Sequence, residues 1–189
     1  VVSDHKARAV IANAAVANAC TGIDGLTDSQ CEAEHVATLV GCQTDEVVVA
    51  STGVIGVRLD MPSILVGATT AHTSLDRGDA VDESAARAIM TTDTVPKSAT
   101  VERNGTRFGG IAKGAGMLAP QLATMLVFLT TDAVVDPEEF QDVLAQACDV
   151  TFSRVDSDAC MSTNDTVVAM SSGASGVSLT GDALVSTLT

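Results

Sequence analysis

The run from Lys113 to Asp132 constrains the fold of this chain more than any other segment. It joins a glycine-containing turn at residues 113–117 to a mostly apolar stretch at residues 122–133. A short apolar stretch bounded by turn residues predicts a buried strand. Near its start, Thr124 follows a small residue, Ala123. A hydroxyl there can attack the preceding carbonyl, and the freed threonine would then carry a nucleophile and its own base, the α-amine.

The core of the fold must be aliphatic, because the sequence has no Trp or Tyr and only four Phe. Hydrophobic residues make up 46% of the 189 residues, so we expect a packed core and no bulk disorder. Strand-like and helix-like runs are mixed along the chain and include a hairpin. The predicted fold class is therefore layered α+β.

Strands are predicted at residues 7–13, 46–50, 122–133 and 165–170, with a hairpin over 98–112 that turns at Asn104–Gly105. Helices are predicted at residues 27–39, 62–75 and 82–90, the last capped by Asp82. A fourth helix begins after Asp136, with Pro137 in the first helical position and Glu139 at the capping-box site.

The formal net charge of −14 excludes some partners. Acidic residues number 24 against 10 basic ones, whereas binding to nucleic acid or anionic membranes needs clustered Lys and Arg. Two interpretations fit the charge: an ordinary acidic cytosolic protein, or adaptation to high salt, where ions screen self-repulsion. The sequence favours the second. No run of about 18 apolar residues predicts a membrane span.

The cysteines and histidines give no sign of a metal site or a disulfide framework. The five cysteines are odd in number and lack Cys-x-x-Cys spacing, and the three histidines lie far apart. Reduced thiols in a cytoplasmic protein are the expectation. The chain begins with Val rather than Met and shows no signal-peptide pattern, which we interpret as an internal segment of a longer precursor.

Four short motifs each allow two interpretations. Residues 51–53 (Ser-Thr-Gly) are a strand-to-loop transition or an oxyanion hole. Residues 90–93 end a helix or form the polar wall of a substrate pocket. Residues 109–117 are a plain glycine turn or a flexible backbone beside Lys113, and they lack the order of a phosphate loop. Residues 162–166 are best interpreted as an Asx or Ser/Thr turn.

Together, these segments resemble the ornithine acetyltransferase family, the glutamate N-acetyltransferases of arginine biosynthesis. The resemblance depends on the order and spacing of seven blocks across nearly the whole chain. The blocks are residues 13–22, 51–56, 89–93, 109–120, 123–126, 130–133 and 162–166.

The resemblance implies a precursor that cuts itself between Ala123 and Thr124. Thr124 would be the nucleophile, with Thr52 and Gly53 as the oxyanion hole. Thr91 and Lys113, together with Thr124, would bind substrate. Residues 1–123 would then be the C-terminal part of a first (α) subunit, and residues 124–189 the N-terminal part of a second (β) subunit. The implied fold is a layered α/β sandwich that resembles N-terminal-nucleophile hydrolases in outline, with its own topology.

The implied reaction moves acetyl from N-acetylornithine to glutamate by a ping-pong mechanism. An α-amine has a reference pKa of about 7.7–8 and can act as the base near neutral pH. The implied assembly contains two α and two β subunits, with no metal or cofactor, and acetyl-CoA stays open as a second donor. Two alternatives remain: an amidase or aminopeptidase with the same nucleophile, and a non-catalytic fragment.

Overall fold

The computed structural model describes residues 4–119 and 122–189. The chain divides into two compact units, the first ending at Thr91 and the second beginning at Thr92. Helices and strands occur in both units, so the α+β prediction is confirmed at the level of fold class.

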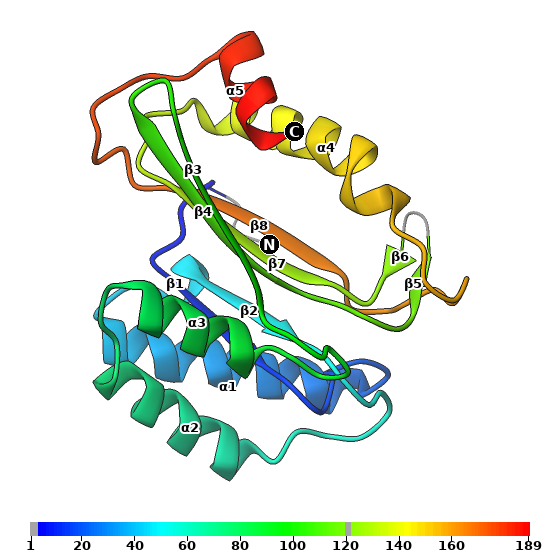
Figure 1. The fold of residues 1–189 in the computed structure, drawn as a ribbon. Helices are drawn as coiled ribbons and strands as arrows, with labels where there is room; N and C mark the ends of the chain where they lie inside the picture. The colour runs from blue at the N-terminus through cyan, green and yellow to red at the C-terminus, as the bar shows by residue number, and fades with distance from the viewer. Residues whose placement is uncertain (1–3, 120–121) are drawn as a thin grey trace. The chain divides into compact units, whose positions relative to one another are not determined.

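The first unit is built on two parallel strands, β1 (Ala9–Asn13) and β2 (Val47–Ser51), which pair from Ala9 opposite Val47 onward. Helix α1 (Gly22–Val40) and the short helix η1 (Thr44–Glu46) connect them, because parallel neighbours need a crossover. Helices α2 (Met61–Thr73) and α3 (Asp79–Ala88) follow (Figure 1). Buried residues of α1 and β2 form the core of this unit: Ala33, Val36, Ala37 and Val47.

Two helices of this unit begin earlier than predicted. Helix α1 begins at Gly22 rather than near residue 27, because its first turn is fixed by Asn18, whose amide donates to the Gly25 carbonyl at 2.8 Å. Helix α3 begins at Asp79 with Gly78 as its N-cap. The prediction that Asp82 caps this helix is therefore wrong: Asp82 lies inside the first turn, where a negative charge still favours the helix dipole.

The second unit contains a four-stranded sheet in the order β3-β4-β7-β8. The strands are β3 (Lys97–Arg103), β4 (Thr106–Lys113), β7 (Leu126–Thr131) and β8 (Thr166–Ser171). The first three are antiparallel neighbours, and β7 pairs with β8 in parallel. The crossover from β7 to β8 contains α4 (Pro137–Val150) and the short helix η2 (Phe152–Arg154), and the unit ends with α5 (Gly181–Leu188).

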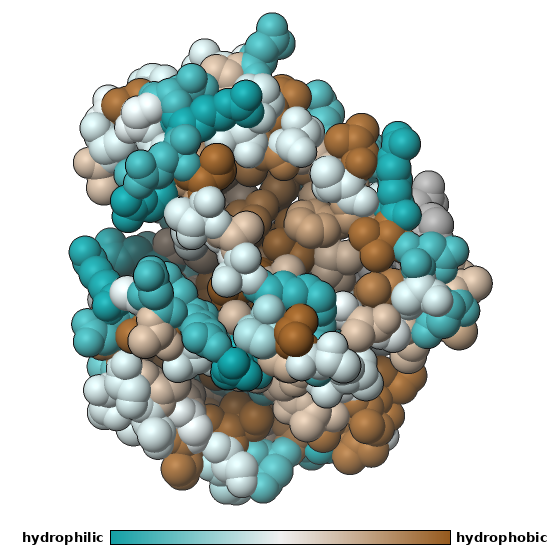
Figure 2. All heavy atoms as spheres, in the orientation of Figure 1, coloured by the Kyte–Doolittle hydropathy of each residue, from teal (hydrophilic) through white to brown (hydrophobic). Residues whose placement is uncertain are grey.

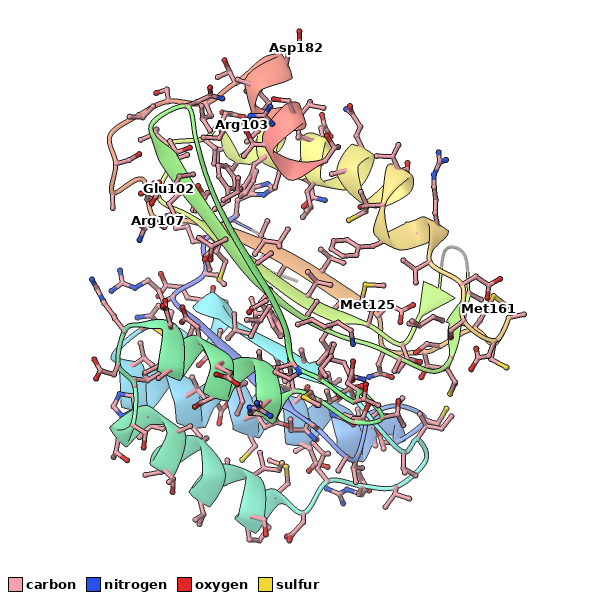
Figure 3. The ribbon with its side chains drawn as sticks, in the orientation of Figure 1. Glu102, Arg103, Arg107, Met125, Met161 and Asp182 are labelled. Atoms are coloured by element: carbon pink, nitrogen blue, oxygen red, sulfur yellow. The ribbon has the colours of Figure 1, made fainter. Side chains whose placement is uncertain are left out.

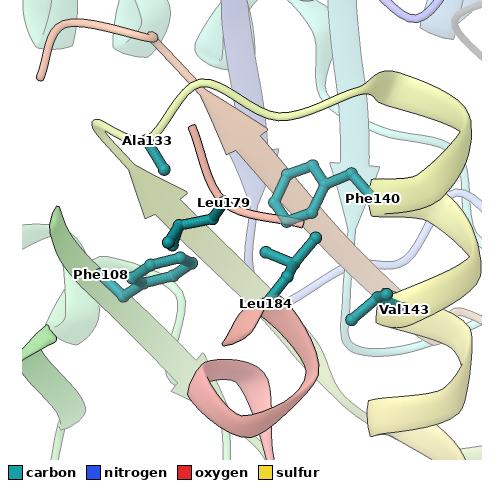
Figure 4. Packing of buried hydrophobic residues seen from close by; sticks show 6 residues of the cluster. All are labelled: Phe108, Ala133, Phe140, Val143, Leu179 and Leu184. Carbon is teal, nitrogen blue, oxygen red and sulfur yellow. The ribbon is translucent and has the colours of Figure 1, made fainter. Parts of the chain in front are cut away.

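Helices α4 and α5 cover one face of this sheet through an apolar cluster (Figure 4). Its buried residues come from β4, α4, α5 and the connecting segments: Phe108, Ala133, Phe140, Val143, Leu179 and Leu184. Helix α4 contributes Phe140 and Val143 to this cluster. As predicted, the Asp136 side chain caps α4, accepting from Glu138 N–H at 3.1 Å and Glu139 N–H at 3.0 Å. The Glu139 carboxylate instead accepts from Gly181 N–H at 2.5 Å.

The predicted strand over 122–133 is two strands with a break between them. Strand β6 (Leu122–Ala123) pairs with β5 (Leu118–Ala119), whereas β7 begins at Leu126 and pairs with β4 and β8. Thr124 and Met125 lie between the two ladders. The apolar pattern gives no sign of this break, because the change of pairing partner, rather than a turn residue, ends the strand.

The surface hydropathy and the helix lengths relate to the prediction that the chain has no membrane span. Figure 2 shows both hydrophilic and hydrophobic residues on the visible face, as is usual for a folded chain. None of the helices in residues 4–119 and 122–189 has the length and apolar character needed to cross a membrane.

Candidate functional site

Thr124 lies at the break between β6 and β7. Its N–H donates to the Met117 carbonyl at 2.8 Å, which ties it to the start of the β5–β6 hairpin. Its Oγ1 is buried and has no hydrogen-bond partner among the residues that the structure describes. Leaving a buried hydroxyl unpaired costs about 1–3 kcal/mol, so such a group in a native fold calls for an explanation. A hydroxyl that acts as a nucleophile would be one such explanation.

Gly114 packs directly against the backbone of Thr124. A Cβ added to Gly114 would lie 2.9 Å from the Thr124 carbonyl oxygen, and Gly114 has φ +148°, a conformation that side chains disfavour. The glycine-containing turn of the sequence therefore has a specific role. It lets the end of β4 approach the residue that follows the predicted cleavage point.

Lys113 precedes this glycine as the last residue of β4, opposite Leu126 of β7. It is 2% exposed. Burial lowers the pKa of its ammonium group, and the negative charges of Asp93 and Asp165 oppose that shift. Lys113 and Thr124 therefore lie at the same end of the β4–β7 pair.

Aspartates bind the peptide groups around Thr124. The Asp165 carboxylate accepts from Met125 N–H at 3.3 Å, and burial raises its pKa. Asp158 accepts from Met117 N–H at 2.8 Å, and hydrogen bonds from Met117 and Cys160 hold the pKa of its carboxyl below the usual range. Figure 3 labels Met125, which directly precedes β7. The segment before β8 therefore binds the backbone on either side of Thr124. The sequence indicated only a turn for residues 162–166.

Thr52 and Gly53 follow β2 in the first unit. Thr52 is 1% exposed, and its N–H donates to the Asn13 carbonyl at 3.0 Å. Gly53 has φ +131°, and a Cβ there would lie 2.2 Å from the Ala15 carbonyl. The next residue, Val54, donates to the Ala15 carbonyl at 2.9 Å. This loop is therefore packed closely against the loop after β1.

The predicted site residues divide between the two units. Thr52, Gly53 and the exposed Thr91 belong to the first unit, and Lys113, Ala123 and Thr124 belong to the second. The structure brings together the members of the second group. Sequence reasoning missed Asp93, Asp158 and Asp165. The motifs at 90–93 and 162–166 contained two of them, but nothing in the sequence showed that they contact the glycine turn and Met125.

Within the described residues, no group of three or more His, Cys, Asp or Glu side chains could hold a metal ion. The candidate site contains a hydroxyl, an ammonium group, carboxylates and backbone N–H groups. That set can carry out nucleophilic acyl transfer.

Comparison with known proteins gives the family. The model of the ArgJ family matches residues 1–189. The chain is 53% identical over 175 residues to the arginine biosynthesis bifunctional protein ArgJ of Thermobifida fusca (strain YX), covering 93% of this chain and 45% of that protein. It is 51% identical over 183 residues to the protein of the same name from Streptomyces coelicolor, covering 97% and 47%.

Two solved structures are also similar to this chain. Ornithine acetyltransferase complexed with ornithine, from Mycobacterium tuberculosis, is similar with a TM-score of 0.58 and 43% identity, over 59% of this chain and 61% of that chain. The arginine biosynthesis bifunctional protein argJ of Bacillus halodurans is similar with a TM-score of 0.51 and 35% identity, over 62% and 61%. Three of these four relatives are named as arginine biosynthesis bifunctional proteins, and the fourth is named as an ornithine acetyltransferase.

The chain belongs to the ArgJ family, and the resemblance drawn from its seven sequence blocks is confirmed. It spans about half the length of the curated relatives it matches.

Proposed function

We propose that the protein containing this chain is a self-cleaving glutamate N-acetyltransferase of arginine biosynthesis. The observation that carries the proposal is the buried Thr124 hydroxyl, unpaired among the described residues, at the strand break directly after Ala123. Membership of the ArgJ family supports it, as does the likeness to an ornithine acetyltransferase whose structure contains ornithine.

The self-cleavage follows from the chemistry of Thr124. Its Oγ1 attacks the Ala123 carbonyl, the amide C–N bond breaks, and an ester between Ala123 and the threonine oxygen replaces it. Water then hydrolyses that ester. The products are an Ala123 carboxylate and a threonine with a free α-amine and a free hydroxyl, so one water molecule is consumed and no other reactant is needed.

The acetyl transfer uses the same hydroxyl. The α-amine of Thr124 takes the hydroxyl proton as Oγ1 attacks the acetyl carbonyl of N-acetylornithine. Thr52 and Gly53 stabilise the tetrahedral oxygen, and ornithine leaves as the free amine. The amine of glutamate then attacks the acetyl-threonine ester, which forms N-acetylglutamate and restores the hydroxyl. Lys113 and Thr91 bind the substrates, and the ammonium of Lys113 suits a substrate carboxylate.

The proposal extends to the assembly. Residues 1–123 would belong to the α subunit and residues 124–189 to the β subunit, in a cytoplasmic heterotetramer of two α and two β subunits. The fold would be a layered sandwich resembling N-terminal-nucleophile hydrolases in outline. The reaction needs no cofactor. Because the relatives are named bifunctional, acetyl-CoA is included as a second donor.

Intact mass spectrometry of the complete gene product tests the proposal. We expect two fragments that meet at Ala123–Thr124, and one uncut chain in the Thr124→Ala variant. Thr130→Ala, which removes an exposed hydroxyl on β7, is the matched control and should cleave normally. The cleaved protein should form N-acetylglutamate from N-acetylornithine and glutamate. Release of acetate without transfer would instead favour an amidase, and an uncut wild-type chain would favour a non-catalytic protein.

A further inference from the structure

Asp93 is a buried acid in the second unit that the proposed chemistry does not use. Its side chain is 0% exposed. It lies between α3 and β3, at the end of the 90–93 motif, for which the sequence allowed the wall of a substrate pocket. A carboxylate is expensive to bury without partners, so the groups that bind it indicate what it does.

Asp93 and Lys97 together bind both polar groups of the Gly114 backbone. The Asp93 carboxylate accepts from Gly114 N–H at 2.8 Å and forms an ion pair with the Lys97 ammonium. Lys97 also donates to the Gly114 carbonyl at 3.1 Å. Gly114 is therefore held from two sides by one ion pair, and we call Asp93, Lys97 and Gly114 the Gly114 clamp.

Thr124 lies next to the clamp, because Gly114 packs against its backbone without a side chain between them. The space for a Cβ at Gly114 is limited by the Thr124 carbonyl oxygen at 2.9 Å and by Met125 Cα at 3.7 Å. Any shift of Gly114 would therefore move the Thr124 backbone or open a gap beside it. The negative charge of Asp93 also acts on the buried ammonium of Lys113.

We propose that Asp93 is a positioning residue for the Thr124 nucleophile: through Lys97 and Gly114 it holds the Thr124 backbone where Oγ1 can reach the Ala123 carbonyl. This inference rests on the proposed self-cleavage. Asp93 touches neither the reacting atoms nor the substrate in this role. It acts on the rate by fixing geometry, and a misplacement of about 1 Å in a reacting group can slow a reaction about 100-fold.

The test follows the rate of self-cleavage in the complete gene product, by intact mass at timed intervals after synthesis. Asp93→Asn keeps an oxygen that can accept from Gly114 N–H but removes the charge that holds Lys97. We expect cleavage to slow about 10- to 100-fold. Lys97→Ala, at a side chain that is 44% exposed, should slow it similarly, and Lys97→Arg should restore part of the rate. Glu102→Gln breaks the exposed Arg107–Glu102 pair in the same sheet (Figure 3), and should change nothing.

Two further measurements separate positioning from folding. In a Thr124→Ala background, which stays uncut, Asp93→Asn should leave the melting temperature within a few degrees. The Asp93→Asn and Lys97→Ala effects on the logarithm of the rate should be less than additive, since both act through Gly114. If the wild-type chain cleaves and the Asp93→Asn and Lys97→Ala variants cleave at the same rate, this inference is overturned. The proposed function would still stand. A wild-type chain that never cleaves would overturn the proposed function and this inference with it.

Discussion

Replacing Glu32 should change stability in a way that depends on pH. Glu32 lies in α1, is 1% exposed, and neither carboxylate oxygen has a hydrogen-bond partner among the residues that the structure describes. Burial, and then the negative charge of Asp28, raises the pKa of Glu32 from 4.5 to about 7. The folded chain therefore holds this proton more tightly than the unfolded chain.

The free energy of unfolding follows from that difference. Well below pH 4.5, Glu32 is protonated in both states, and its ionisation does not affect stability. As pH rises from 4.5 to about 7, the unfolded chain loses the proton first, so stability falls by about 1.4 kcal/mol per pH unit. Above pH 7 the loss is complete, at about 3–4 kcal/mol. For a chain of this size that corresponds to about 7–14 °C in melting temperature.

Glu32→Gln removes the ionisation but keeps the shape, so it should raise the melting temperature at pH 8 and change it little at pH 4.5. Thermal unfolding by circular dichroism at the two pH values measures this. Glu34→Gln, at an exposed position on the same helix, is the matched control and should have a small effect at both. If the gain from Glu32→Gln is the same at pH 4.5 and pH 8, Glu32 does not titrate as the structure implies.

Three further predictions concern the first unit and the charge of the whole chain. Gly53→Ala should reduce acetyl transfer strongly and lower the melting temperature, because the new Cβ meets the Ala15 backbone at 2.2 Å; a fully active, equally stable variant would contradict the packing. Arg58→Ala should lower the melting temperature more than Arg87→Ala, because Arg58 pairs with Asp28, which is 4% exposed, whereas the Arg87–Glu83 pair is exposed on both sides. Finally, the melting temperature of the wild-type protein should rise from low to molar KCl if the charge of −14 reflects salt adaptation, and a flat or falling curve would refute it.

Local signals in the sequence predicted much of the fold. Asn104–Gly105 predicted the β3–β4 turn, and both residues adopt the positive φ angles that such a turn requires. Asp136 and Pro137 predicted the start of α4. These predictions succeed because residues within a few positions of one another determine the structure. The start of α1 and the break at Thr124 depend instead on distant partners, Asn18 for one and the change from β5 to β4 for the other.

At the candidate site, too, the sequence did not predict contacts between residues that are distant along the chain. The sequence identified Thr124 and Lys113, because their residue types and order suggest a reaction. It could not identify the clamp, because the Asp93–Gly114 contact joins residues 21 positions apart. Nor could it show that the glycine turn is needed for a close backbone approach at Gly114. The Asp93–Gly114 contact and the close approach at Gly114 both depend on burial and on contacts between distant residues. The periodicity of the sequence does not predict either of these.

The sheet order of the second unit determines what self-cleavage would leave behind. Strand β4 precedes the proposed cut, β7 and β8 follow it, and β4 pairs with β7 along six residue positions, from Phe108–Thr131 to Lys113–Leu126. The two products would therefore share one continuous sheet, with the break just before its inner strand β7. They should separate on a denaturing gel yet travel together through gel filtration, and neither should be able to refold without the other.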